Sequence, residues 1–170
     1  MKQTFYNQAT INTWLHNIIR EMAFDNWKPN YIVGLARGGL IPAIFLSHYL
    51  DIPMHTLKVS LRDNPDTESN LWMPEEALGV TADLKKILIV DDINDSGETL
   101  SWIKEDWRAN CLPKCPHWDD VWGNNVRTAV LVNNVVSKSS VDYSGTDINK
   151  NEEPQWIIFP WEQWWDNRTQ

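Results

Sequence analysis

Residues 86–100, KILIVDDINDSGETL, decide the fold of this 170-residue chain. The aliphatic run Ile87 to Val90 ends in an acidic pair, Asp91 and Asp92, and a polar turn, Asn94 to Thr99, follows it. Beyond the turn the apolar residues take up helical spacing. The order is therefore strand, loop and helix, and in parallel sheets ligands collect at the carboxyl ends of the strands. This stretch predicts an α/β protein with a ligand site at the loop.

The turn itself has the composition of an anion-binding loop. Ser96, Gly97 and Thr99 are small or carry hydroxyl groups, so the backbone can approach an anion at a helix start, where partial positive charge gathers. A Gly-x-x-x-x-Gly-Lys loop is absent, so a phosphate would be held here without a lysine. Asp91 and Asp92 suit sugar hydroxyls or a Mg²⁺ ion. A strand end with an aspartate helix cap is the alternative for a lone Asp-Ser-Gly, and the whole string favours a ligand site.

The rest of the chain alternates between strand and helix patterns. Apolar spacing predicts helices at 8–25, 40–50 and 97–110, strands at 31–35, 54–61, 127–133 and 157–159, a short strand near 141–143 and a helical turn at 161–165. Residues 62–83 carry two prolines and little periodicity, so in a compact domain they are either a disordered insertion or a functional lid. Residues 1–170 thus predict one α/β domain with a mostly parallel, twisted sheet and helices on both faces.

Composition excludes several classes of function. A net charge of −8 without a Lys/Arg run argues against nucleic-acid binding. No apolar run approaches the ~20 residues needed to cross a bilayer, and the N-terminus lacks signal-peptide form. Two cysteines are consistent with a reducing, cytoplasmic location. Cys111, Cys115 and His117 are close in sequence, but their spacing matches no common zinc pattern.

Three stretches carry a family resemblance. ILIVDDINDSGETL resembles the phosphoribosyl pyrophosphate (PRPP) motif of type I phosphoribosyltransferases. YIVGLARGGLIPA, residues 31–43, resembles the strand, turn and helix that hold pyrophosphate in xanthine/guanine members. QWIIFPW, residues 155–161, resembles their purine-stacking segment, although a buried edge strand ended by proline is an alternative. The resemblance implies the type I fold with a small C-terminal hood, formed by about 1–25 and 137–170, and a lid at about 62–83.

The resemblance also implies an activity. It is the transfer of a 5-phosphoribosyl group from PRPP to a purine base (guanine, xanthine or hypoxanthine) in purine salvage, with Mg²⁺ as cofactor and pyrophosphate as product. The implied catalytic residues are Asp95, which is also a candidate helix cap, and Arg37. Asp91 and Asp92 would hold the ribose, and Asp92 also the metal. The other implied PRPP ligands are Ala36, Gly38, Gly39, Ser96, Gly97, Glu98 and Thr99, and Arg62 of the lid is a further candidate.

The base site departs from the family pattern. Trp156 and Ile157 would contact a purine, but Asn134 stands where purine enzymes place a lysine against the 6-oxo oxygen. Asparagine can donate or accept a hydrogen bond, so other bases stay open. A non-catalytic PRPP or nucleotide sensor is a further alternative, which the Arg37-Gly38-Gly39 turn disfavours because a nucleotide sensor needs no pyrophosphate site. The resemblance suggests a homodimer or homotetramer.

Overall fold

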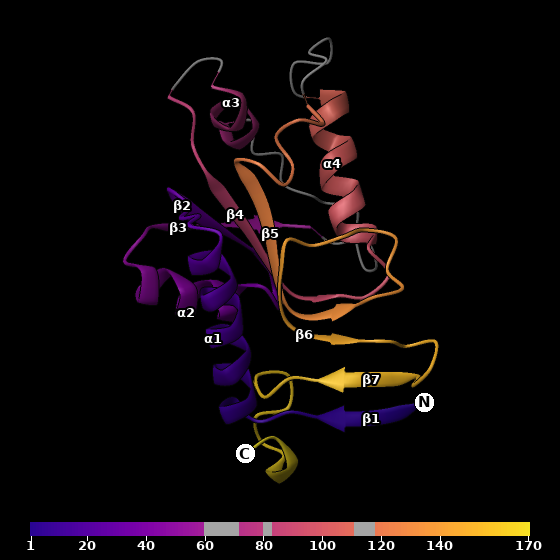
Figure 1. Ribbon diagram of the computed structural model, residues 1–170. Helices are drawn as coiled ribbons and strands as arrows, with labels where there is room; N and C mark the ends of the chain where they lie inside the picture. Colours follow the sequence, from indigo (N-terminus) through magenta and orange to yellow (C-terminus); the bar gives the residue numbers. More distant parts are fainter. Residues whose placement is uncertain (60–71, 80–82, 111–117) are drawn as a thin grey trace.

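A computed structural model describes residues 1–59, 72–79, 83–110 and 118–170. Its central sheet has five strands in the order β3-β2-β4-β5-β6, and every neighbouring pair is parallel (Figure 1). The strands are β2 (Tyr31–Ala36), β3 (Met54–Lys58), β4 (Ile87–Asn94), β5 (Val126–Asn134) and β6 (Tyr143–Ile148). The expected parallel α/β architecture is therefore confirmed.

Helices cover both faces of this sheet. They are α1 (Gln8–Phe24), α2 (Leu40–Leu50), α3 (Trp72–Leu78) and α4 (Glu98–Asn110). Successive strand residues point to opposite faces. Ile32 and Leu88 accordingly join a core under α1 and α2, whereas Val33 and Ile89 join a second core under α3 and α4. Among the described helices, none is long and apolar enough to cross a membrane.

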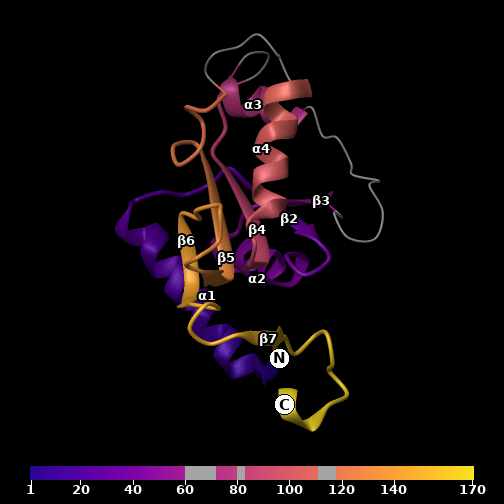
Figure 2. The ribbon, with the colours of Figure 1, turned by 90° about the vertical axis from the view of Figure 1, so that its right-hand side faces the viewer.

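A separate two-stranded sheet brings the two ends of the chain together. β1 (Lys2–Phe5) pairs in parallel with β7 (Gln155–Ile158), and Figures 1 and 2 show this pair far from α3 and α4. The residues expected to form the hood, about 1–25 and 137–170, are thus divided between the small sheet and the central sheet. Its outermost strands form the small sheet, whereas α1 lies on the central sheet against β5 and β6. A short 3₁₀ helix, Asn167–Thr169, ends the chain.

The strand order places a crevice beside β4. The chain leaves β2 for β3 on one side and returns to β4 on the other, which is the switch point where α/β sheets bind ligands. The β2–β4 pairing ends at Gly34 and Val90, but β4 stays paired with β5 as far as Asn94. The acidic pair therefore lies on a strand that has separated from one neighbour and is still held by the other.

Five local expectations differ from the structure. β4 runs through the acidic pair because β5 continues to pair with it, and β6 begins where the strand near 141–143 was expected to end. α3 lies within 62–83, where no element was predicted, since its seven residues are too few to show a clear helical repeat; Met73 and Ala77 belong to the core. β1 was not predicted, because its order depends on pairing with distant β7. The helical turn expected at 161–165 is wrong, because only 167–169 form a 3₁₀ turn.

Candidate active site

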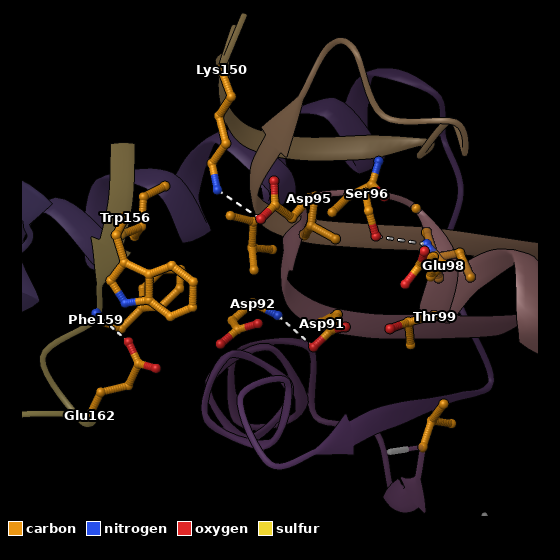
Figure 3. A pocket seen from close by; sticks show the side chains of 17 residues that line it. Asp91, Asp92, Asp95, Ser96, Glu98, Thr99, Lys150, Trp156, Phe159 and Glu162 are labelled. Atoms are coloured by element: carbon orange, nitrogen blue, oxygen red, sulfur yellow. Dashed lines mark hydrogen bonds and ion pairs between the residues drawn. The ribbon is translucent and has the colours of Figure 1, made fainter. Parts of the chain in front are cut away.

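A cavity of about 320 Å³ opens at the carboxyl end of β4. Figure 3 shows the polar loop after β4 on one side and side chains of β7 and of the segment after it on the other, with the acidic pair between them. The cavity is lined by Val59, residues 91–100, Val130, Lys150, Trp156, Ile157, Phe159 and Glu162. The predicted phosphate loop, acidic pair and base-stacking segment thus line one cavity, although Trp156 lies more than 55 residues from the loop in sequence.

Gly97 sets the shape of the loop. Its φ is +84°, a conformation that side chains rarely adopt, and a Cβ there would lie 2.5 Å from Ser137 Oγ and 2.6 Å from the Ser139 nitrogen. Helix α4 begins at the next residue, Glu98. The glycine therefore allows the chain to turn tightly from β4 into the helix while the 137–139 segment lies directly behind it.

The amides of this loop are available to an anion. Within the described part of the chain, no backbone hydrogen bond is donated by Asp95, Ser96, Gly97 or Thr99. The Glu98 N–H donates to Ser96 Oγ over 3.3 Å. A helix start that presents unbonded N–H groups to a cavity attracts negative charge. These features are what a phosphate site requires.

The Glu98 side chain leaves this arrangement undisturbed. Its carboxylate is exposed and lies 3.8 Å from the ammonium of Lys138, which is also exposed. Because the charge of Glu98 is solvated and close to a cation, it adds little repulsion at the loop. The residue can therefore contribute its backbone to the loop without its side chain taking part.

A second segment, Ser137–Ser139, fixes the loop from behind. Asn94 Nδ2 donates to the Ser139 carbonyl at 2.7 Å, and Ser137 Oγ donates to Asn94 Oδ1 at 2.9 Å. Ser139 Oγ donates to the Gly97 carbonyl at 2.9 Å, and the Lys138 N–H to the Ser96 carbonyl at 3.2 Å. The carbonyl groups of Ser96 and Gly97 are thus bonded to the 137–139 segment, which leaves the loop amides available to the cavity. Sequence reasoning missed this support.

The two carboxylates of the acidic pair face different parts of the site. Asp91 lies on the side of Thr99, and Asp92 on the side of Trp156 and Glu162 (Figure 3). Asp91 Oδ1 accepts a hydrogen bond from the Asp92 N–H at 2.9 Å. Burial, and then the charge of Asp92, raises the pKa of Asp91 well above its ordinary range. Burial, and then the charge of Glu162, raises the pKa of Asp92 to about 6.

The turn after β2 lies against the acidic pair. The peptide bond between Ala36 and Arg37 is cis. A Cβ on Gly38 would collide with Asp92 Oδ2, and one on Gly39 would collide with the Val90 carbonyl oxygen. Position 39 therefore requires glycine, because backbone atoms block a side chain there, whereas a side chain at position 38 would displace the Asp92 carboxylate. None of residues 36–39 lines the cavity, so the structure places this predicted pyrophosphate turn at its border.

Arg37 is the catalytic candidate of that turn. Its side chain is exposed, and no hydrogen bond or ion pair joins its guanidinium to another described residue. Arg62 and most of the expected lid lie outside the described residues, as do Cys111, Cys115 and His117.

Lys150 enters the cavity from the segment between β6 and β7. Its ammonium donates to Asp95 Oδ2 over 2.8 Å, and its side chain is 17% exposed (Figure 3). Asn134, the expected base ligand, does not line the cavity. It is buried, its Nδ2 donates to the Asp95 carbonyl at 3.1 Å, and its Oδ1 accepts from the Lys150 N–H at 3.2 Å. Nothing in the sequence around Lys150 indicated that it reaches the site.

The opposite wall is aromatic and acidic. Trp156 is 46% exposed and lines the cavity, so its indole face is open to a planar ligand. Ile157 is buried, and its backbone belongs to β7. The Phe159 N–H donates to Glu162 Oε2 at 2.9 Å, which holds that carboxylate beside Asp92. Glu162 is a second residue that sequence reasoning missed.

The oxygen atoms of this site suit a Mg²⁺ ion. Asp92 and Glu162 present two carboxylates whose mutual repulsion helps to raise the pKa of Asp92, and a divalent cation would relieve it. Across the described residues, no cluster of three or more His, Cys, Asp or Glu side chains could hold a metal alone. The donor set fits an ion that shares its coordination with waters and ligand oxygens, as Mg²⁺ usually does.

Comparison with protein families identifies the family of this chain. The family model described as "Phosphoribosyl transferase domain" matches residues 3–168. The chain belongs to this family. The parallel sheet and the crevice beside β4 are accordingly those of a type I phosphoribosyltransferase fold.

Several relatives of this phosphoribosyltransferase domain are named for purine substrates. Xanthine-guanine phosphoribosyltransferase from Cereibacter sphaeroides is 28% identical over 139 residues, which cover 81% of this chain and 72% of that protein. The enzyme of the same name from Idiomarina loihiensis is 27% identical over 164 residues, covering 92% and 88%. A solved purine phosphoribosyltransferase from Pyrococcus horikoshii superposes with a TM-score of 0.66 at 25% identity, covering 95% of each chain.

Proposed function

We propose that this phosphoribosyltransferase domain transfers the 5-phosphoribosyl group of PRPP to a purine base, with guanine, xanthine and hypoxanthine as the expected acceptors. The observation that carries this proposal is the pairing of unbonded loop amides with an open indole across one cavity. The amides suit a phosphate, and the indole suits a flat heterocycle. The names of the relatives support a purine as that heterocycle.

In the proposed reaction one bond is exchanged for another. The bond from the anomeric C1′ to the pyrophosphate oxygen breaks, and its electrons leave with pyrophosphate. A ring nitrogen of the base forms the new bond to C1′, and the base loses one ring proton. The anomeric carbon is cation-like in between, so the protein must hold both phosphate ends and keep water out.

Each part of the cavity has a role in this proposal. The amides of residues 95–99 bind the 5′-phosphate, and Asp91 and Asp92 accept hydrogen bonds from the ribose hydroxyls. The turn of residues 36–39, with the Arg37 guanidinium, binds pyrophosphate at the border of the cavity. Trp156 stacks on the base, and the Ile157 backbone reads its edge. Asp95 accepts the proton from the ring nitrogen.

Mg²⁺ is the proposed cofactor, and Asp92 and Glu162 are the residues that would hold it. Bound there, it would neutralise negative charge on the leaving pyrophosphate. Residues 62–83 are proposed as a lid over the reacting centre; of these, α3 is docked on the central sheet through Met73 and Ala77.

A turnover assay with a panel of bases tests the proposal. The protein is mixed with PRPP, Mg²⁺ and guanine, xanthine, hypoxanthine, adenine, uracil or orotate, and pyrophosphate and nucleotide are quantified separately. We expect equal amounts of pyrophosphate and purine nucleotide, which no pyrimidine should yield. PRPP affinity is measured in parallel by calorimetry. Tight PRPP binding without turnover for any base would instead support a sensor, and turnover with a pyrimidine would refute the purine assignment.

A further inference from the structure

We propose that Asn94 and Ser139 are positioning residues of the phosphate loop, residues 95–99, and that they aim its N–H groups at the cavity from behind. The inference rests on the proposed function and names residues on which binding of the 5′-phosphate depends. It begins from a series of hydrogen bonds that runs from the end of β4, through the 137–139 segment, to the carbonyl groups of the loop. Both side chains are buried.

The planarity of the peptide bond connects the back of the loop to its front. Each trans peptide unit holds the carbonyl of one residue and the N–H of the next in one plane, pointing in opposite directions. The Ser96 carbonyl accepts from the Lys138 N–H at 3.2 Å, so the Gly97 N–H of the same unit points away from that bond. The Gly97 carbonyl accepts from Ser139 Oγ at 2.9 Å, which fixes the Glu98 N–H in the same way. These bonds also polarise both peptide units and strengthen their N–H groups as donors.

Asn94 holds the segment that makes these bonds. Its Nδ2 donates to the Ser139 carbonyl at 2.7 Å and to Asn133 Oδ1 at 2.9 Å. Its Oδ1 accepts from Ser137 Oγ at 2.9 Å. Both donors and the oxygen of this buried amide are therefore bonded to the protein. Because Asn94 is the last residue of β4, its amide ties the end of the strand to the segment whose Ser139 hydroxyl orients the loop.

Two partial ligands separate positioning of the phosphate loop from general support of the fold. Ribose 5-phosphate carries the 5′-phosphate alone, whereas pyrophosphate belongs to the turn of residues 36–39. An effect through the loop amides must weaken the first ligand and spare the second. Loss of general support would weaken both.

Ser139→Ala removes the hydroxyl that bonds the Gly97 carbonyl and leaves the backbone in place. We expect the Kd of ribose 5-phosphate to rise about 2- to 10-fold, the range for one neutral hydrogen bond, and the KM for PRPP to rise by the same factor. Because the 5′-phosphate takes no part in the bond exchange, kcat should stay within about twofold of the wild type. Calorimetry should show unchanged affinity for pyrophosphate with Mg²⁺.

A double-mutant cycle tests whether Asn94 acts through Ser139. Asn94→Val should weaken ribose 5-phosphate at least as much as Ser139→Ala does. The double variant should bind no more weakly than Asn94→Val alone, because residues of one network are not additive. Should Asn94→Val fail to fold, Ser137→Ala takes its place in the cycle, since it removes the hydroxyl that bonds the Asn94 oxygen.

Ser144→Ala is the matched control. It removes a serine hydroxyl bond of the same length, 2.9 Å, to Asp147 on β6, and should change neither affinity. Equal loss of ribose 5-phosphate and pyrophosphate in Ser139→Ala, or no loss of ribose 5-phosphate, would overturn the inference. Effects that multiply in the double variant would overturn the role of Asn94. Failure of the proposed function is distinct, because the wild type would then bind neither ribose 5-phosphate nor PRPP.

Discussion

Replacing Asp92 with asparagine should stabilise the ligand-free protein. Burial and the charge of Glu162 raise the pKa of Asp92 from an ordinary 3.8 to about 6. A raised carboxyl pKa means that the folded protein binds the proton more tightly than the unfolded chain does. This group therefore contributes most to stability below about pH 4, and that contribution is lost as the pH rises to about 6. Asparagine is neutral throughout and avoids the cost of the buried charge.

The shift sets the size of the effect. About 2 pKa units correspond to at most about 3 kcal/mol at pH 7 and above, about half of that at pH 5, and about 0.5 kcal/mol at pH 4. Because Asp92 is only partly buried and neighbours Asp91, we expect Asp92→Asn to raise the free energy of unfolding by about 1–3 kcal/mol at pH 7. The gain should shrink steadily as the pH falls toward 4.

Urea unfolding at pH 4, 5, 7 and 8, followed by circular dichroism, measures this difference directly. Glu105→Gln, which neutralises an exposed carboxylate on α4, is the matched control and should change stability by less than about 0.5 kcal/mol. A destabilised Asp92→Asn protein at pH 7, or a gain that does not depend on pH, would refute the reasoning. It would mean that Asp92 is held by favourable contacts rather than strained by burial and repulsion.

Three other predictions concern the loop and its neighbours. Gly97→Ala should lower the free energy of unfolding by more than about 1 kcal/mol and weaken PRPP binding. Alanine would have to adopt a positive φ, and its Cβ would collide with the 137–139 segment. Urea unfolding identical to that of the wild type would contradict this. Asp95→Asn should lower kcat about 10²- to 10⁴-fold with PRPP affinity retained, and unchanged single-turnover rates would remove its proton role. Mg²⁺-dependent PRPP affinity should fall about tenfold from pH 8 to pH 5 as Asp92 gains a proton, and calorimetry on Asp92→Asn should show a shallower dependence.

The sequence predicted best what is contiguous along the chain. Strand β4, the acidic pair and the loop through Thr99 form one unbroken stretch, so their residue types and spacing carry the whole local geometry. The core helices were predictable for the same reason, since Ile11, Trp14, Leu15 and Ile18 repeat on one helical face. Local pattern therefore determined the central architecture and the position of its ligand loop.

What the sequence did not reveal depends on contacts between distant segments. Lys150 and Glu162 are single charged residues in irregular stretches, and only the packing of β6 and β7 brings them into the cavity. The Ser139 hydroxyl bonds a carbonyl 42 positions away, so no local pattern could signal its role. Asn134 was expected to contact the base because it stands where purine enzymes place a lysine, but its amide is occupied by Asp95 and Lys150.

The most direct test of the central claim is a crystal structure of the protein with inosine monophosphate. The account predicts that the 5′-phosphate lies about 2.9 Å from the amide nitrogens of Ser96, Gly97 and Thr99. The hypoxanthine ring should then stack on Trp156. A nucleotide bound with its phosphate elsewhere, or loop amides bonded within the protein, would contradict the account.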